Sequence, residues 1–487
     1  MPDLRRQVLE SGKTISRKAA SREGSRRTSR TASAQNSRPS SRPTSRYGSD
    51  EEDAGNLSDE TTALSIGSLD DLTEDPDQDT NNWTQELDDV VADILDRKRS
   101  SILSREEAYA AFCRLAKSHY VEDHIRSQVS DLLAAFCRSV KFESSVRETT
   151  LALRALELLA ITAFDNTIYE NVESLLSRSI RDSTSTSIKA AAIHCLGVCT
   201  MFGGAGEDGI LDQMTFFLDI AASDGQSIDA PDDANSVTAA LQEWGMLATE
   251  IDDLEGESED AVQIFMDQLD SGDSGVQVAA GENIALLYEK SYTEQEDDED
   301  EEDEEGHSND ADSDEESFLS PGERCGPKLI KRYNAYHNTH ELEQQLQSLA
   351  TIHNKRISKR DKKSLHSNFT SILTTVTNPR RGPMYNTAID QDTNRRYGSK
   401  LTVKVGSQGV MNIDRWWKWI RLNSLRRILQ GGFAAHYFQG NRAVLDNLPV
   451  MVRMNFASSS DRSAAKRAAK SRNNRRWAVH DHSDEEY

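Results

Sequence analysis

The sequence predicts an all-α fold, because apolar residues recur at helical spacing between about residues 83 and 290 and no segment there alternates like a β-strand. Four of these helical segments also resemble one another, and they begin at Thr149, Lys189, Val237 and Gln277. Their starts are offset by 40, 48 and 40 residues, close to the length of HEAT and armadillo units. We therefore predict an armadillo- or HEAT-like helical-repeat solenoid, in which neighbouring units bury one continuous core.

Two columns of this alignment hold the predicted packing residues. The first column is always alanine, which lets neighbouring helices approach closely, and the second, four residues later, is always large and apolar. The columns contain Ala152, Ala192, Ala240 and Ala280, followed by Leu156, Leu196, Trp244 and Ile284. The alternative is an ordinary helical bundle whose helices resemble one another by chance.

Residues 1–80 are predicted to be a disordered tail, first Arg/Ser-rich and then acidic. Residues 1–47 hold 12 Lys and Arg against 3 Asp and Glu, whereas residues 48–96 hold 17 acidic residues and no Lys or Arg. A segment of this composition has too few apolar residues to offset the entropy lost on ordering. Its serines and threonines beside arginines fit basophilic kinases, although such short patterns also arise by chance.

The predicted repeat domain spans residues 81–293. Ahead of the four similar segments, helical periodicity covers residues 84–98, 105–118 and 125–141. The first of these helices has one apolar stripe, which consists of Leu87, Val90, Val91, Ile94 and Leu95. Packing partners of the four similar segments are predicted between them, at 166–181, 207–222 and 258–270.

An acidic linker, predicted to be disordered, follows at residues 294–322 and is expected to end the solenoid. Residues 294–316 contain 16 acidic residues and no basic ones, so this segment repels itself and stays extended. Its simplest role is to keep the chain soluble. The alternative is a mimic of nucleic acid that shields the basic C-terminal half, which a comparison of RNA affinity with and without residues 294–316 would decide.

A basic, mostly helical C-terminal domain is predicted at residues 323–457, because residues 323–477 hold 30 Lys and Arg against 9 acidic residues. Helices are expected at 341–353 and from Ile357, and an alternating strand at 400–405. The helix from Ile357 begins with basic residues that are candidate RNA contacts, namely Lys359, Arg360, Lys362 and Lys363.

The most aromatic stretch of the chain predicts another helix, with Asp414 as its N-cap and two glycines, Gly431 and Gly432, at its end. Its predicted packing face consists of Ile413, Trp416, Trp417, Ile420 and Ile428. Trp419 falls outside that face, beside Arg415 and Arg426. We expect these three residues to form either an exposed patch that stacks on RNA bases and binds phosphate, or the rim of a packing contact.

The last segment, residues 458–487, combines a predicted basic helix with an acidic end. Seven cations lie on that helix and almost no apolar face accompanies them: Arg462, Lys466, Arg467, Lys470, Arg472, Arg475 and Arg476. Such a helix has no reason to pack on its own protein, so we predict that it folds against the phosphates of RNA. A nuclear-import signal is the alternative, and the two uses are compatible.

No motif indicates catalysis, since the sequence has no GxxxxGK[ST] phosphate loop, no GxSxG nucleophile elbow and no HExxH zinc motif. His194, Cys195 and Cys199 share one helix, where buried packing is favoured over a metal site. We therefore predict a non-enzyme without cofactor, metal or small-molecule substrate. Five scattered cysteines and the lack of a long apolar run predict a cytoplasmic and nuclear protein that contacts no membrane.

With these residues in view, the chain resembles the interferon-related developmental regulator family, in a divergent, fungal-type form. The resemblance covers most of residues 80–480. It rests on the helical array and on three segments: ISKRDKKSLHSNFTSIL from Ile357, DRWWKWIRLNSLRRILQGGF from Asp414 and AAKRAAKSRNNRR from Ala464. The acidic insertion and the Arg/Ser-rich tail match the family less well.

The resemblance implies two different roles. One is that of a translation regulator on inactive ribosomes, whose basic C-terminal helix enters the path of mRNA. In this sequence that helix corresponds to the basic residues from Arg462 to Arg476. The other is that of a transcriptional co-regulator, whose helical-repeat surface binds transcription factors or chromatin-modifying complexes. We expect a ribosome or another rRNA-containing complex as partner, with proteins bound on the helical-repeat surface.

Overall fold

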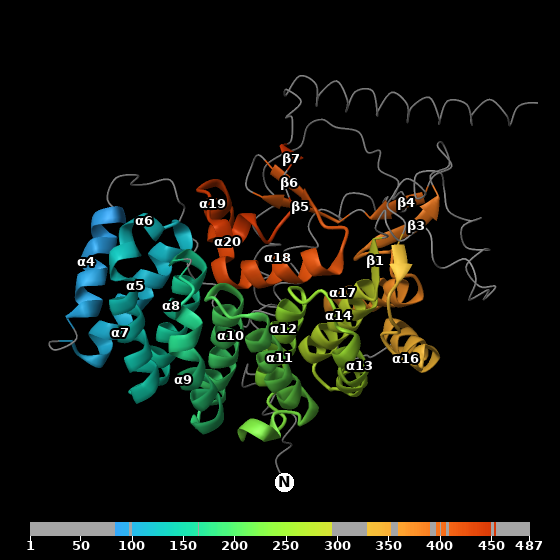
Figure 1. Cartoon of the computed structure of the whole chain (residues 1–487), viewed down its shortest axis with the longest axis horizontal. Coiled ribbons are helices and arrows are strands. Elements are labelled where there is room, and N and C mark those ends of the chain that lie inside the picture. The colour runs from blue at the N-terminus through green and yellow to red at the C-terminus, as the bar shows by residue number, and fades with distance from the viewer. Residues whose placement is uncertain are drawn as a thin grey trace, which may run out of the picture. The chain divides into compact units, whose positions relative to one another are not determined.

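Four inner helices form the centre of the helical array in the computed structural model (Figure 1). They are α8 (Val146–Ala163), α10 (Thr186–Phe202), α12 (Ala234–Ala248) and α14 (Ser274–Lys290), and each packs on the next in that order. They coincide with the four similar segments of the sequence. Every residue of the two predicted columns is at most 1% exposed, so the predicted all-α repeat fold is confirmed.

The structure describes residues 83–96, 100–163, 165–294, 329–351, 359–389, 396–399, 401–405, 409–449 and 452–453. All of them belong to one compact unit, residues 53–487. The predicted N-terminal tail, most of the acidic linker and the predicted terminal helix lie outside these described residues. The five-part division of the chain therefore stays a prediction.

Small residues permit the close packing of the inner helices. A Cβ atom on Gly197 would lie 2.3 Å from the Glu243 carboxylate, and one on Gly245 would lie 2.1 Å from the Asn283 amide oxygen. Asn283 in turn donates a 2.8 Å hydrogen bond to the carbonyl of Leu241 on α12. Glycine at these two positions thus leaves room for polar side chains between neighbouring helices.

The other helices of the repeat domain follow the prediction with small shifts at their ends. The outer partners are α9 (Ile168–Asp182), α11 (Glu207–Ala222) with the turn η3 (Gln226–Ile228), and α13 (Glu255–Leu269). The array begins with α4 (Trp83–Leu95), α5 (Ile102–Ser118), α6 (Glu122–Ile125), η2 (Arg126–Gln128) and α7 (Val129–Phe142). In the predicted stripe of α4, Leu87, Val91 and Ile94 are buried, whereas Leu95 is exposed.

The array continues past residue 293, where the sequence places its end. Helix α17 (Lys359–Thr377) packs on α14, and α16 (Thr339–Thr351) packs on α17 (Figure 1). The contact between α14 and α17 is close, because a Cβ on Gly281 would lie 2.7 Å from Ile372. Two short strands lie between α14 and α16 in the sequence: β1 (Tyr292–Glu294) pairs antiparallel with β2 (Leu329–Lys331). Glu294, where the acidic segment begins, is therefore held beside Leu329.

The remaining elements are short strands and helices around one longer helix. The predicted strand is β5 (Thr402–Val405), in the antiparallel order β5–β6–β7 with β6 (Gly409–Asn412) and β7 (Val452–Arg453). A second hairpin pairs β3 (Tyr385–Ile389) with β4 (Arg396–Ser399). The predicted tryptophan-rich helix is α18 (Trp416–Leu429), followed by η5 (Gln430–Gly432), α19 (Phe433–Phe438) and α20 (Arg442–Leu445).

Candidate nucleic-acid interface

Helix α18 contains or adjoins three of the predicted RNA contacts, and it lies across the inner helices of the array (Figure 1). It packs on α14 and α12, and also contacts α8 and α5. The side chains of α18 therefore have two possible environments, the array and the solvent. Which of them face the array decides which cations remain available for RNA.

The start of α18 is capped by the array and not by the predicted Asp414. The buried Glu289 carboxylate on α14 accepts hydrogen bonds from the backbone N–H groups of Trp416 (2.8 Å) and Trp417 (3.2 Å). The residue at the N-cap position is Arg415, without a side-chain cap, while Asp414 pairs with Lys418 at 2.5 Å. The prediction of Asp414 as N-cap is wrong, because a carboxylate from a distant helix satisfies these donors.

Burial is the main influence on the ionisation of Glu289. It raises the pKa of this carboxyl to about 7, although the two backbone N–H donors and the positive charge of Arg415 oppose the shift. A carboxylate at a helix N-terminus also interacts favourably with the helix dipole. Glu289 therefore ties α18 to α14 by both hydrogen bonding and electrostatics.

The tryptophans of α18 face differently from the prediction. Trp419 is only 7% exposed, and its indole N–H donates a 2.8 Å hydrogen bond to Glu282 on α14. Trp417 is half-buried instead, and the cationic groups of Lys418 and Arg421 lie over its ring, 5.4 and 5.2 Å from the centroid. The prediction of an exposed stacking patch at Trp419 is therefore wrong, because α14 covers this side of α18 as well.

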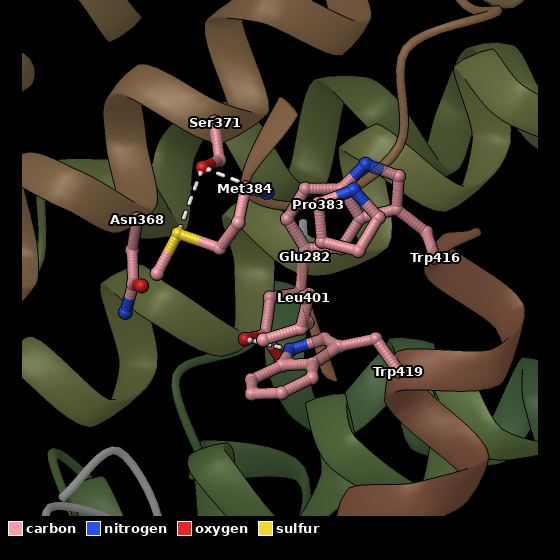
Figure 2. Close-up of a pocket in the computed structure, with 8 residues that line it drawn as sticks. All are labelled: Glu282, Asn368, Ser371, Pro383, Met384, Leu401, Trp416 and Trp419. Carbon is pink, nitrogen blue, oxygen red and sulfur yellow. Dashed lines mark hydrogen bonds between the residues drawn. The ribbon is translucent and has the colours of Figure 1, made fainter. Parts of the chain in front are cut away.

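A small cavity lies between α18 and α17, and both Trp416 and Trp419 line it (Figure 2). Its volume is about 20 Å³, which is room for one water molecule and far too little for a nucleotide base. The remaining lining residues are Glu282, Asn368, Ser371, Pro383, Met384 and Leu401. Trp416 itself is fixed at this edge, since its indole N–H donates to the Thr375 hydroxyl at 2.7 Å. This part of α18 is a packing contact.

Two arginines of α18 bind the acidic inner surface of the array. Arg427 pairs with Glu243 on α12 and lies 3.7 Å from Glu157 on α8. Arg421 donates to the Thr249 hydroxyl at 2.8 Å and to Glu250 at 2.8 Å, at the C-terminus of α12. These cations stabilise the docking of α18, so they are poor candidates for phosphate contacts.

The buried Glu243 also explains the environment of His194. The Nδ1 atom of His194 lies 2.7 Å from the Glu243 carboxylate, and burial lowers the pKa of His194 well below its usual value. The sulfur atoms of Cys195 and Cys199 are 4.0 Å apart, and both side chains are buried. Within the described ranges, no group of three His, Cys, Asp or Glu residues is arranged to hold a metal ion.

The other predicted RNA contacts have mixed placements. Arg415 and Arg426 are half-buried on or beside α18. Lys359, Arg360, Lys362 and Lys363 lie in the first turns of α17, where the side chain of Lys363 is exposed and the other three side chains lie outside the described residues. The seven cations from Arg462 to Arg476 also lie outside the described residues, so their role stays a prediction.

Sequence reasoning missed the residues that fix α18. Glu243, Glu282 and Glu289 are acidic residues among the mainly apolar packing residues of α12 and α14, and this interruption of the apolar pattern was the available signal. Sequence reasoning also did not select Arg380 and Arg381 as candidate RNA contacts; they lie between two prolines in the loop after α17. That loop contacts the start of α18, since a Cβ on Gly382 would lie 1.8 Å from the Asp414 carbonyl oxygen.

These features define a helical-repeat scaffold, in which an acidic inner surface holds a basic helix of the same chain. In the described part of the chain no helix is long and apolar enough to cross a membrane. Residues 53–377 match the interferon-related developmental regulator family, and the chain belongs to that family. The family is regulatory, and this chain is accordingly a regulatory protein.

The extent of the family match agrees with the structure. It ends at Thr377, the last residue of α17, so it covers the whole helical array including the pair α16–α17. The chain is also 24% identical over 386 residues to an uncharacterised protein of Schizosaccharomyces pombe, covering 78% of each chain. Helix α18 and the basic terminal segment lie beyond the family match.

Proposed function

We propose that the chain is a non-enzymatic scaffold that binds a ribosome or another ribonucleoprotein and regulates translation. In this proposal the basic segment from Arg462 to Arg476 occupies an RNA path, and the helical array contacts protein surface. This is one of the two roles that the family resemblance implies.

The anchoring of the C-terminal region to the array is the observation that carries the proposal. Glu243 and Glu289 hold the two ends of α18, and β7 pairs with β6 at Val452 and Arg453. The predicted basic segment begins at Ser458, five residues after Arg453. A cationic segment tethered so close to a folded platform has a high effective concentration at any RNA beside that platform.

The charge of the chain supports different binding partners for the array and for the basic segment. The whole chain has a formal charge of −25, while the segment from Arg462 to Arg476 carries seven positive charges and no acidic residue. Cations bind RNA phosphates by releasing counterions, whereas an acidic surface repels RNA. The array is therefore suited to protein contacts and the basic segment to RNA.

Sedimentation of the chain with ribosomes through sucrose gradients tests this function. The test variant replaces all seven cations by glutamine: Arg462, Lys466, Arg467, Lys470, Arg472, Arg475 and Arg476. Its matched control replaces seven Lys and Arg residues among residues 1–47, so both variants lose the same charge. The full chain and the control should co-sediment with ribosomes, and the test variant should remain near the top of the gradient.

Equal sedimentation of both variants would refute the role of the basic segment. The gradients are repeated after RNase treatment, which should abolish binding that depends on RNA. The alternative, a nuclear co-regulator that binds transcription factors or chromatin-modifying complexes, predicts RNase-insensitive binding and a solely nuclear location. Helix α18 already covers part of α12 and α14, so a bound peptide would need another surface of the array.

A further inference from the structure

The loop between α17 and β3 carries a pair of arginines, Arg380 and Arg381, in the sequence NPRRGPM from Asn378. We propose that this loop, together with Arg415, is a preformed phosphate-binding site for the RNA backbone, separate from the basic terminal segment. The proposal deepens the proposed function and rests on it.

Hydrogen bonds fix the shape of the loop. The Thr375 hydroxyl donates to the Arg381 carbonyl oxygen at 2.6 Å, and it also accepts the indole N–H of Trp416 at 2.7 Å. At the start of the loop the backbone N–H groups of Arg380 and Arg381 both bond to Asn378, at 3.1 and 2.9 Å. These hydrogen bonds position the backbone from which the two arginine side chains extend.

Glycine brings this loop against the start of α18. A Cβ atom on Gly382 would lie 1.8 Å from the carbonyl oxygen of Asp414 and 3.2 Å from the backbone nitrogen of Arg415. No larger residue fits at this position. The close approach places the Arg380–Arg381 pair and Arg415 on neighbouring backbone, although 34 residues separate Arg381 from Arg415 in the sequence.

The three arginines bring three positive charges to this loop and to the start of α18. Arg380 is exposed, and Arg381 and Arg415 are half-buried. Among residues that the structure describes, none of the three forms an ion pair with a carboxylate. Of the acids around Arg415, Asp414 pairs with Lys418, and Glu289 accepts the backbone N–H groups of Trp416 and Trp417 while it also attracts Arg415 electrostatically.

The chemistry of this cluster fits phosphates. A guanidinium group offers planar pairs of N–H donors that match the oxygens of a phosphate, and a rigid backbone lowers the entropy cost of binding. Arg381 additionally lies over the ring of Tyr385, with 5.6 Å between its guanidinium carbon and the ring centroid. Since phosphates repeat along an RNA strand, neighbouring arginines can each meet one, which gives binding without base specificity.

The test uses the full chain and a fluorescently labelled single-stranded RNA of uniform sequence, with binding measured by anisotropy. The variant R380Q/R381Q should raise Kd by about tenfold and reduce the slope of log K against log salt by about 1.4, because two arginines no longer bind phosphates. Its control, R147Q/R178Q, removes two exposed arginines from the array and should change Kd less than about twofold. Thermal unfolding checks that both variants fold.

An unchanged Kd for R380Q/R381Q overturns the proposal. A peptide of residues 294–316 serves as a second probe. If the variant binds this peptide more weakly but binds RNA normally, the proposal is also overturned, in favour of an acidic protein ligand. The seven-glutamine variant separates the two proposals. If the seven-glutamine variant fails to bind RNA while R380Q/R381Q still binds it normally, the loop site is overturned and the proposed function stands. If R380Q/R381Q fails to bind RNA while the seven-glutamine variant still binds it, the result supports the loop site and contradicts the proposed role of the basic segment.

Discussion

Individual carboxylates on the array determine how α18 is held. Glu289 caps its first turn, Glu282 accepts the Trp419 indole N–H, and Glu243 pairs with Arg427 near its end. At the same end Arg154 of α8 donates to the carbonyl oxygen of Arg427 at 2.8 Å. Carboxylates at the N-terminus and a cation at the C-terminus both suit the dipole of α18.

The raised pKa of Glu289 predicts a pH dependence of stability. Burial raises the pKa to about 7 from its usual value of 4.5, so the folded state holds this proton more tightly than the unfolded state. The contribution to stability is therefore fully present below about pH 4.5 and is lost as pH rises to about 7. Glu289→Gln removes the titration but weakens the cap, which costs about 1 kcal/mol.

Thermal unfolding at pH 5 and pH 7.5 measures this effect. The difference in Tm between E289Q and the unaltered chain should shift in favour of the variant at the higher pH. An equal difference at both pH values would contradict the raised pKa.

Residue positions were predictable where one periodicity governs the packing. The alanine and large apolar columns of the inner helices repeat with helical spacing, and all of their members are buried. The faces of Trp417 and Trp419 were not predictable, because α18 packs against the array and also against the segment around Leu401. Glu289 precedes Trp416 by 127 residues, so no local pattern could assign it as the cap.

At the scale of elements, the long helices were predictable and the short pairings were not. The array helices α4 and α8, with 13 and 18 residues, show their apolar period clearly. The strands β3 and β7 have only five and two residues, and β7 pairs with β6, which lies much earlier in the chain. The pair α16–α17 continues the array beyond a long acidic segment, whose composition by itself indicates an end.

The C-terminal end of α18 is fixed to the first helices of the array by the elements that follow it. Lys117 of α5 donates to the Gln430 side chain at 2.8 Å, and the His436 imidazole on α19 bonds to the Ala116 carbonyl at 2.9 Å. A Cβ on Gly432 would lie 1.7 Å from the Lys117 carbonyl oxygen. This glycine is therefore required for the close packing of η5 on α5.

Two adjacent glycines provide a matched test of that packing. Gly432→Ala should lower Tm by several degrees, because the new methyl group meets rigid backbone. Gly431→Ala should leave Tm nearly unchanged, since nothing lies within 4 Å of a Cβ at that position. Limited proteolysis should in parallel cut the region around α18 faster in G432A. Equal behaviour of the two variants would show that η5 does not anchor the C-terminal region.

At the scale of the whole molecule, the array, α18 and the short sheets form one platform of a regulatory protein. The inner helices bind α18 through acidic side chains, which neutralise Arg421 and Arg427. Of the cations that we propose for a polyanion, Arg380 and Arg381 lie in the loop beside the start of α18, and those from Arg462 to Arg476 lie outside the described residues. Shielding of these cations by the acidic linker stays a prediction.

The salt dependence of ribosome binding tests the central claim most directly. The affinity of the full chain and of the seven-glutamine variant is measured between about 50 and 200 mM salt. If the basic segment binds RNA phosphates, log K for the full chain should fall steeply with log salt. The slope of the variant should be shallower by about 0.7 for each phosphate that the variant no longer binds. Identical slopes for the two proteins would contradict the claim that this segment anchors the protein to RNA.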